Sequence, residues 1–254
     1  MPQQPEQPRT PNVGVWTGVS ALAVAFFTVI EFLVRQIFVG SRPPLDQAAA
    51  LAEFSHRTAA GTLGVIVIDT FLMASLVVFL AAFRQLITQR RRDLSWVSAL
   101  AYGSGIAYVA VTLVGDGMEG GAALDAAGAH PDVHVIRALT LGHALLFGSI
   151  GCVLTGLVAG ASGYVTIISG ALPRWTGRLA LVVAVANLVA VATVFGGTDD
   201  SFRSVGGWGT AALATFPWLV WVVCVGIVVL RGNRDHHDIA KADATASVAT
   251  IDAD

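Results

Sequence analysis

The chain has 254 residues, of which 55% are hydrophobic and only 13% are charged, and its formal net charge is −2. Soluble domains carry about 25% charged residues, so this deficit places the chain among membrane proteins. The small net charge gives no indication of nucleic-acid binding. The two cysteines, Cys152 and Cys224, lie in apolar runs without a CxxC spacing, which argues against a disulfide framework or a thiol redox centre.

Six stretches of the sequence are long and apolar enough to cross a bilayer, which takes about 20 residues in a helix. A Pro- and Gln-rich segment, residues 1–13, precedes them and is predicted to be disordered. A polar cytoplasmic tail, residues 231–254, is predicted to follow them. We therefore predict an all-α, polytopic transmembrane bundle rather than a membrane barrel, whose strands are shorter and alternate in polarity. The predicted spans are 14–38, 61–83, 95–115, 136–160, 178–197 and 209–230.

The basic residues predict the orientation of the spans. With the N-terminus inside, ten of the 15 Lys and Arg residues fall on the cytoplasmic side and five on the outer side. The densest group is "RQLITQRRRD" at 84–93. Because cytoplasmic loops are enriched in basic residues, both termini are predicted to be cytoplasmic. The composition, rich in Ala, Val and Gly with a single Lys, suggests a bacterial protein, so we predict a multi-pass protein of a bacterial cell membrane.

Two outer loops and two packing features are predicted along the chain. In the first outer loop, "RPPLDQAAALAEFSHRTAA", we expect a short interfacial helix after Pro44. The second, "DGMEGGAALDAAGAHPDVHVIR", is expected to be long, flexible and acidic. Small residues at intervals of four in the fourth span predict a close helix–helix contact; they are Gly148, Cys152, Gly156 and Gly160. Pro217 predicts a kink in the sixth span.

Ionisable residues on three different spans are predicted to share one depth in the outer half of the membrane. At 1.5 Å per residue, Glu31 and His143 lie about 10 Å deep and Asp69 about 12 Å deep. Such groups usually face the bundle interior or a water-filled cavity. We therefore predict a polar layer that forms a ligand or proton site; its candidates are Glu31, Arg35, Asp69, His143, Arg137 and Asp116.

The partners of these charges are predicted in part. Glu31 and Arg35 are four residues apart and are expected to pair on one helix face. Asp69 requires another partner, and Arg35, His143 and Arg137 remain open as its candidates.

Metal and cofactor sites are weakly indicated. His130, Asp132 and His134, near Asp116 and Glu119, are candidate metal ligands, but "GAHPDVH" matches no recognised ligand pattern, so no metal is predicted. A haem held by two histidines is not expected because only His143 lies within a span. We predict no cofactor, no nucleic-acid partner and the lipid bilayer as surroundings, and leave a small-molecule ligand or protein partner open.

The stretch "ALPRWTGRLALVVAVANLVA", residues 171–190, resembles a recurring loop-and-helix passage of uncharacterised bacterial multi-pass membrane proteins, those grouped under domains of unknown function. The six-span layout is similar to theirs as well. The resemblance implies an integral membrane protein and carries over no activity and no site residues.

Three functions are compatible with the polar layer. The first is a non-enzymatic role as a small-molecule or proton-linked permease, a sensor or an accessory subunit. The second is a structural role, in which the buried charges only fix the packing of the helices. The third is a membrane-embedded hydrolase or transferase, with or without a metal, and of the three an enzyme is the least favoured.

Overall fold

The computed structural model describes residues 12–199, 201–205 and 207–251, with side chains as far as residue 233. Within these ranges the chain is helical and has no strand. Six helical stretches are long and apolar enough to cross a membrane, which confirms the predicted all-α class and the number of spans. Their bounds are Val13–Val39, Ala48–Arg90, Arg92–Ala126, Val133–Ser169, Arg174–Phe195 and Trp208–Asn233.

Eight α-helices and five short irregular turns make up these stretches. The α-helices are α1 (Val13–Val34), α2 (Ala48–Arg90), α3 (Ser95–Ala126), α4 (Val133–Leu145), α5 (Gly151–Ser169), α6 (Arg174–Ala190), α7 (Trp208–Thr210) and α8 (Phe216–Ile251). The 3-10 turns are η2 (Arg92–Leu94) and η4 (Val191–Phe195), and the π-turns are η1 (Arg35–Val39), η3 (Leu146–Ile150) and η5 (Ala211–Thr215).

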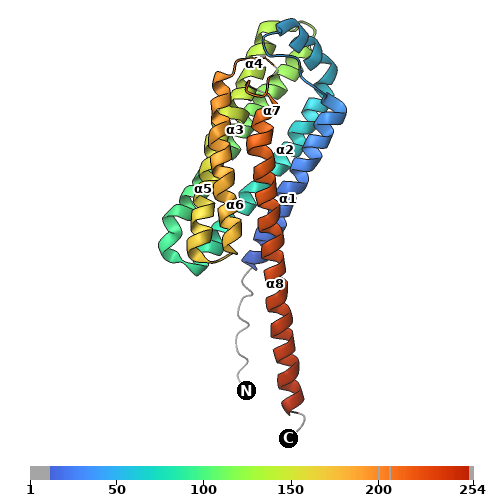
Figure 1. Ribbon diagram of the computed structural model, residues 1–254. Helices are drawn as coiled ribbons and strands as arrows, with labels where there is room; N and C mark the ends of the chain where they lie inside the picture. Colours follow the sequence, from blue (N-terminus) through green and yellow to red (C-terminus); the bar gives the residue numbers. More distant parts are fainter. Residues whose placement is uncertain (1–11, 200, 206, 252–254) are drawn as a thin grey trace.

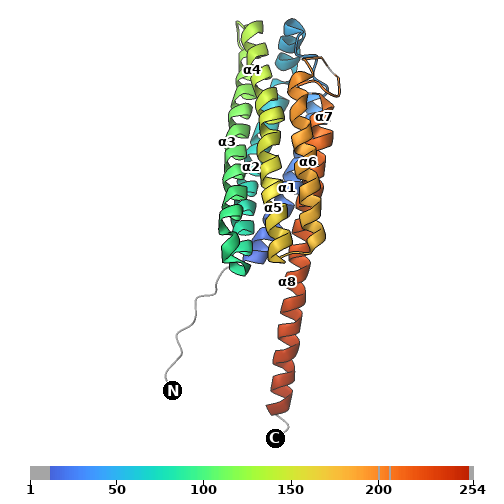
Figure 2. The ribbon, with the colours of Figure 1, turned by 60° about the vertical axis from the view of Figure 1, so that its left-hand side comes forward.

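The helices lie side by side in one elongated bundle (Figures 1 and 2). The start of α1 and the end of α8 lie at the same end, which we call the proximal end. The connections 40–47 and 127–132 and the described residues of the connection between η4 and α7, namely 196–199, 201–205 and 207, lie at the opposite, distal end. Helix α8 continues past the bundle at the proximal end, so the predicted polar tail is helical as far as Ile251. Residues 1–11, most of the predicted disordered N-terminus, and residues 252–254 lie outside the described ranges.

The long helices correct the prediction for the two outer loops. Helix α2 has 43 residues and runs without a break from Ala48, so no separate interfacial helix follows Pro44. Helix α3 continues to Ala126, so the first half of the predicted flexible loop is helical. Both extensions are rich in alanine, which has the highest helix propensity. They also pack together distally, because Ala122, Ala126 and Ile136 form a buried cluster against Ala52 and Leu139.

The core of the bundle is apolar and closely packed. Trp221 on α8 is 1% exposed and lies edge-on to Phe79 and Phe83 of α2, with ring centroids 6.1 and 6.4 Å apart. Helices α5 and α6 approach each other closely where Gly163 faces Gly177: a Cβ on Gly163 would lie 2.7 Å from the Gly177 carbonyl oxygen. Large side chains are therefore excluded at this crossing.

The predicted small-residue face of the fourth span is confirmed in part. Gly156 and Gly160 lie against Ala184 of α6. Cys152 is buried beside Ala190 and Ala214. Gly148 differs, because a Cβ there would meet no atom within 4 Å.

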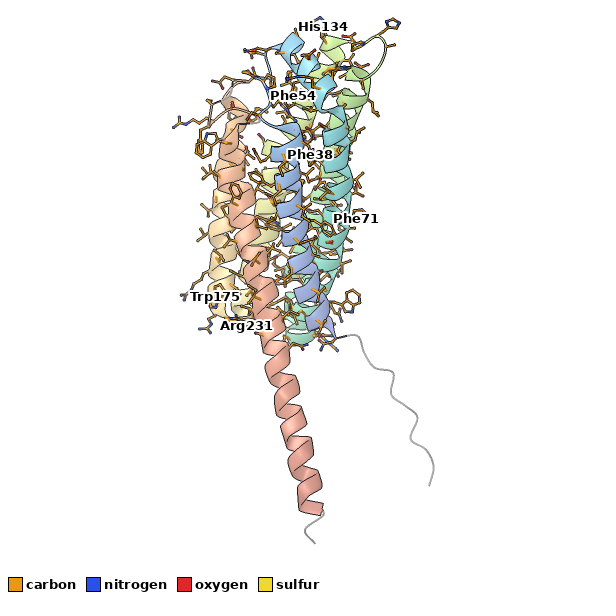
Figure 3. All side chains as sticks on the ribbon, turned by 90° about the vertical axis from the view of Figure 1, so that its right-hand side faces the viewer. Phe38, Phe54, Phe71, His134, Trp175 and Arg231 are labelled. Carbon is orange, nitrogen blue, oxygen red and sulfur yellow. The ribbon has the colours of Figure 1, made fainter. Side chains whose placement is uncertain are left out.

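Apolar side chains also cover the outside of the bundle, as a lipid-facing surface requires. Phe71 is 57% exposed and points away from the bundle (Figure 3). Trp175 lies near the proximal end, and His134 lies at the opposite, distal tip. This distribution agrees with the six apolar spans.

Three of the spans contain a π-turn, in which a backbone N–H bonds the carbonyl five residues earlier. The bonds run from Gly40 to Arg35, from Gly151 to Leu146 and from Phe216 to Ala211. In the last case the cause is visible in the sequence. Pro217 has no N–H to donate to the carbonyl four residues earlier, which favours an irregular turn at the predicted position.

Candidate functional site

Glu119, on the distal half of α3, is the centre of a buried cluster of charged side chains. Its carboxylate accepts two hydrogen bonds from Arg35, at 3.3 and 3.4 Å, and it also contacts the guanidinium of Arg42. The Glu119 side chain is 6% exposed, and those of Arg35 and Arg42 are 28% and 24% exposed. The cluster thus joins α3 to η1 and to the connection that follows it.

The predicted pair on the first span is present. Arg35 Nη2 lies 3.5 Å from Glu31 Oε1, so Arg35 is shared between two carboxylates. Burial lowers the pKa of Arg42 from its ordinary value, and the negative charge of Glu119 opposes that shift. The guanidinium stays protonated, because arginine does not lose its proton in proteins.

His143 adds a third helix to the cluster. Its Nδ1 lies 3.0 Å from the Gly115 carbonyl oxygen on α3, and its Nε2 lies 3.5 Å from Glu119 Oε2. Because a carbonyl oxygen only accepts, Nδ1 carries the proton and donates it, which leaves Nε2 directed at the carboxylate. The ring stacks on Phe147, with centroids 5.7 Å apart. The orientation of the imidazole is therefore fixed from both sides.

Asp69 does not have the partner that the sequence predicts. It is 2% exposed, and neither carboxylate oxygen has a hydrogen-bond partner among the described residues. Its neighbour is another carboxyl group, that of Asp116, whose Oδ2 is likewise buried without a partner. Neither Arg35 nor His143 is bonded to Asp69, because both are turned toward Glu119.

The remaining predicted residues lie away from the cluster. Arg137 donates from Nε to the Leu45 carbonyl oxygen at 3.0 Å and so holds the first distal connection against α4. Asp132 is the N-cap of α4 and accepts from the backbone N–H groups of His134 and Val135. His130 and His134 are exposed. Among the described residues, the His, Cys, Asp and Glu side chains close enough to hold a metal ion are Asp116, Glu119 and His143.

Sequence reasoning placed two residues of the cluster, Glu119 and Arg42, in outer loops. The spacing of Asp116 and Glu119 contained the missing information, because residues three apart share a helix face. It could be used only if α3 were known to continue through "DGMEGG". Arg42 lies outside any helix, so no periodicity places it.

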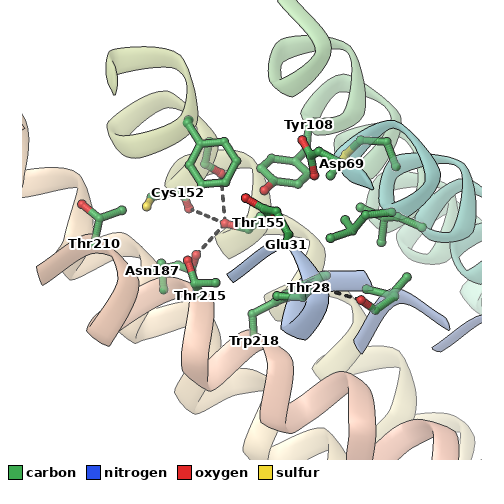
Figure 4. Close-up of a pocket in the computed structure, with 17 residues that line it drawn as sticks. Thr28, Glu31, Asp69, Tyr108, Cys152, Thr155, Asn187, Thr210, Thr215 and Trp218 are labelled. Atoms are coloured by element: carbon green, nitrogen blue, oxygen red, sulfur yellow. Dashed lines mark hydrogen bonds between the residues drawn. The ribbon is translucent and has the colours of Figure 1, made fainter. Parts of the chain in front are cut away.

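Two adjoining cavities lie between the helices beside this cluster. The first, which we call the arginine cavity, has a volume of about 240 Å³. Its polar wall residues are Thr28, Glu31, Arg35, Arg42, His143, Thr210 and Thr215, and Phe32 and Phe147 supply apolar wall. The second, which we call the asparagine cavity, has a volume of about 60 Å³ and is lined by Glu31, Asp69, Tyr108, Thr155, Asn187 and Trp218, among others (Figure 4).

The two cavities share part of their wall. The residues that line both are Thr28, Glu31, Phe147, Thr210 and Thr215. In the asparagine cavity Thr155 is hydrogen-bonded to Asn187, which joins α5 to α6 (Figure 4). Glu31 therefore stands where the cavities meet.

All three π-turns contribute to the wall of the arginine cavity. Arg35 belongs to η1, Phe147 and Gly148 to η3, and Ala211 and Thr215 to η5. π-turns are rare and occur frequently at functional sites. Their convergence on one cavity marks this part of the bundle as the candidate site.

No family model, curated protein or solved structure matches the chain. The resemblance of residues 171–190 to uncharacterised membrane proteins stays a prediction.

Proposed function

We propose that the chain is an integral membrane protein that admits a small solute into the arginine cavity and acts as a proton-linked permease. The observation that carries the proposal is the pair of adjoining cavities, bounded by three π-turns and joined at Glu31. A permease needs a site inside the bundle and helices that can rearrange around it. Irregular turns at the wall supply the second requirement, because their backbone bonds are less regular than those of an α-helix.

The distribution of charge supports a membrane orientation with the distal end outside. Arginines gather at the proximal end: Arg84, Arg90, Arg91, Arg92, Arg174, Arg178 and Arg231. By the positive-inside rule this end is cytoplasmic. The arginine cavity then opens toward the outer side, since Arg42 and Gly207 of its wall belong to distal connections.

The cavity wall indicates the class of solute. Arg35 and Arg42 are only partly buried and retain N–H donors for a carboxylate or another acceptor group. Phe32 and Phe147 offer apolar surface on the same cavity. We infer a small molecule with an acceptor or anionic head and an apolar body. Glu31, at the junction of the cavities, is the proposed proton carrier.

The first test measures access to the cavity. With Cys152 and Cys224 replaced by alanine, Thr215→Cys is expected to react with a membrane-impermeant thiol reagent added from the outer side, because Thr215 lines both cavities. The control is Thr140→Cys, a buried position on α4 that lines neither cavity. If Thr215→Cys is as unreactive as the control in folded protein, the cavity is sealed and the charges have only a structural role.

A cavity-filling pair of variants sharpens this test. Gly148→Leu places a side chain in open space at the wall of the arginine cavity and should slow the labelling of Thr215→Cys. Gly103→Leu adds the same side chain on α3, where a Cβ also meets nothing within 4 Å but no cavity is lined. It should leave the labelling rate unchanged.

Transport is tested in proteoliposomes that contain a pH-sensitive dye. Addition of small aliphatic or aromatic carboxylates should acidify the lumen faster with the wild-type chain than in protein-free liposomes, and Glu31→Gln should abolish this difference. Glu53→Gln, on an exposed surface of α2, is the matched control. Acidification that persists in Glu31→Gln would remove Glu31 from the proton route.

A further inference from the structure

We propose that Asp116, Glu119 and His143 form a binding site for one divalent transition-metal ion. A carboxylate oxygen from each acid and a ring nitrogen of the histidine all lie within 4.8 Å of one another. The three residues are 5%, 5% and 6% exposed. The proposal goes beyond the permease function, because two of the three ligands, Asp116 and Glu119, line neither cavity, and because it is tested without transport.

The separation of two of the ligand atoms already fits a metal ion. His143 Nε2 and Glu119 Oε2 are 3.5 Å apart. Two ligands that bind one zinc ion at about 2.1 Å in tetrahedral geometry are about 3.4 Å apart. Because Nδ1 donates to the Gly115 carbonyl, the lone pair of the neutral imidazole lies on Nε2, on the side of Glu119. Metal-binding histidines are typically held in this way by a hydrogen bond from the other ring nitrogen.

Buried oxygen atoms without partners provide an independent indication of a missing cation. Both oxygens of Asp69 and the Oδ2 of Asp116 have no hydrogen-bond partner in the described part of the chain. Asp69 is 2% exposed and neighbours Asp116, which is one of the three proposed ligands. Buried carboxylates are otherwise paired or bound to metal ions.

The balance of charge in the cluster also favours a bound cation. Four acids take part in the cluster, Glu31, Asp69, Asp116 and Glu119, against two guanidinium groups, Arg35 and Arg42. When all four acids are ionised and His143 is neutral, the cluster carries two negative charges in excess, which one divalent ion neutralises; without the ion, protons on the carboxyl groups neutralise them. Carboxylate oxygens together with an imidazole suit Zn²⁺ or Mn²⁺.

Metal retention by the full-length protein in detergent tests the proposal. The protein is stripped with a chelator, incubated with ZnCl₂ or MnCl₂, desalted and analysed by mass spectrometry for metal content. The wild type and the control Glu53→Gln are expected to retain one ion per chain. Asp116→Asn and His143→Gln should weaken binding by roughly tenfold or more in competition with a fluorescent chelator. Asp116→Glu, which keeps a carboxylate, should retain the ion.

Two results would overturn the proposal. One is a wild-type chain that retains neither metal; the cluster then balances its charge with protons. The other is equal retention by the wild type, Asp116→Asn and His143→Gln, which would place the ion elsewhere. If both variants fail to fold, the midpoint of thermal unfolding of the wild type decides, since added metal must raise it. Labelling of Thr215→Cys is also measured in protein stripped of metal. If Thr215→Cys still reacts there, the cavity is accessible, and a failure to bind metal then counts against the metal site alone and not against the permease.

Discussion

Replacement of Glu119 by glutamine is the most direct test of the charged cluster. Glutamine keeps the shape of the side chain and one acceptor oxygen but removes the charge that faces Arg35, Arg42 and His143. Breaking a buried ion pair by removing one partner costs about 3–5 kcal/mol, because the other charge stays buried.

The structure places the expected cost at the lower end of this range. Arg35 retains Glu31 at 3.5 Å, and the side chains of Arg35 and Arg42 are 28% and 24% exposed. We therefore expect Glu119→Gln to lower the free energy of unfolding by about 3 kcal/mol. The control is Glu53→Gln, whose pair with Arg57 is two-thirds exposed on both sides. Its loss should cost about 0.5 kcal/mol or less.

The assay is equilibrium unfolding in mixed micelles, followed by tryptophan fluorescence and carried out with a chelator present, so that a bound metal does not contribute. A cost for Glu119→Gln as small as that for Glu53→Gln would refute the reasoning. The cluster would then be hydrated, and its contacts would not hold the bundle together.

Three further substitutions test local packing by the same unfolding measurement. Gly163→Ala should destabilise the protein by about 1–3 kcal/mol, because the added methyl group meets a carbonyl oxygen of α6 at 2.7 Å, whereas Gly160→Ala, with its nearest neighbour at 3.6 Å, should change little. Asp132→Ala removes the N-cap of α4 and should cost about 1 kcal/mol; a cost near zero would mean that water replaces the cap. Thr155→Val leaves the Asn187 carbonyl oxygen without its donor inside the asparagine cavity and should cost about 1–2 kcal/mol, unless water there replaces the hydroxyl.

The number of spans and their apolar character could be predicted because a run of about 20 apolar residues has few other solutions. The ends of the helices could not. The Gly- and Ala-rich sequence around Glu119 is typical of a loop as much as of a helix, and the packing of Ala122 and Ala126 against neighbouring helices favours the helix. This error displaced Glu119 from the predicted site.

The depth of an ionisable side chain along its helix could also be predicted better than the direction in which the side chain points from the helix axis. Glu31 and His143 are brought into one cluster as their predicted depths indicate. Asp69, however, neighbours Asp116. This contact could not be predicted, because the sequence pattern alone does not give the rotation of α2 about its axis. A π-turn adds to the difficulty, since it changes the helical period inside a span. The segment η1, RQIFV, contains no proline, glycine or serine that would indicate one.

The π-turns have a consequence for the length of the chain. A regular α-helix turns by about 100° per residue, so deletion of one residue rotates everything beyond it out of phase. A π-turn holds one surplus residue between two α-helical segments. Deletion of one residue within η3, such as Gly148, is therefore absorbed by its conversion to a regular turn. The helices on both sides keep their phase, so we expect the wall of the arginine cavity to tolerate such a deletion.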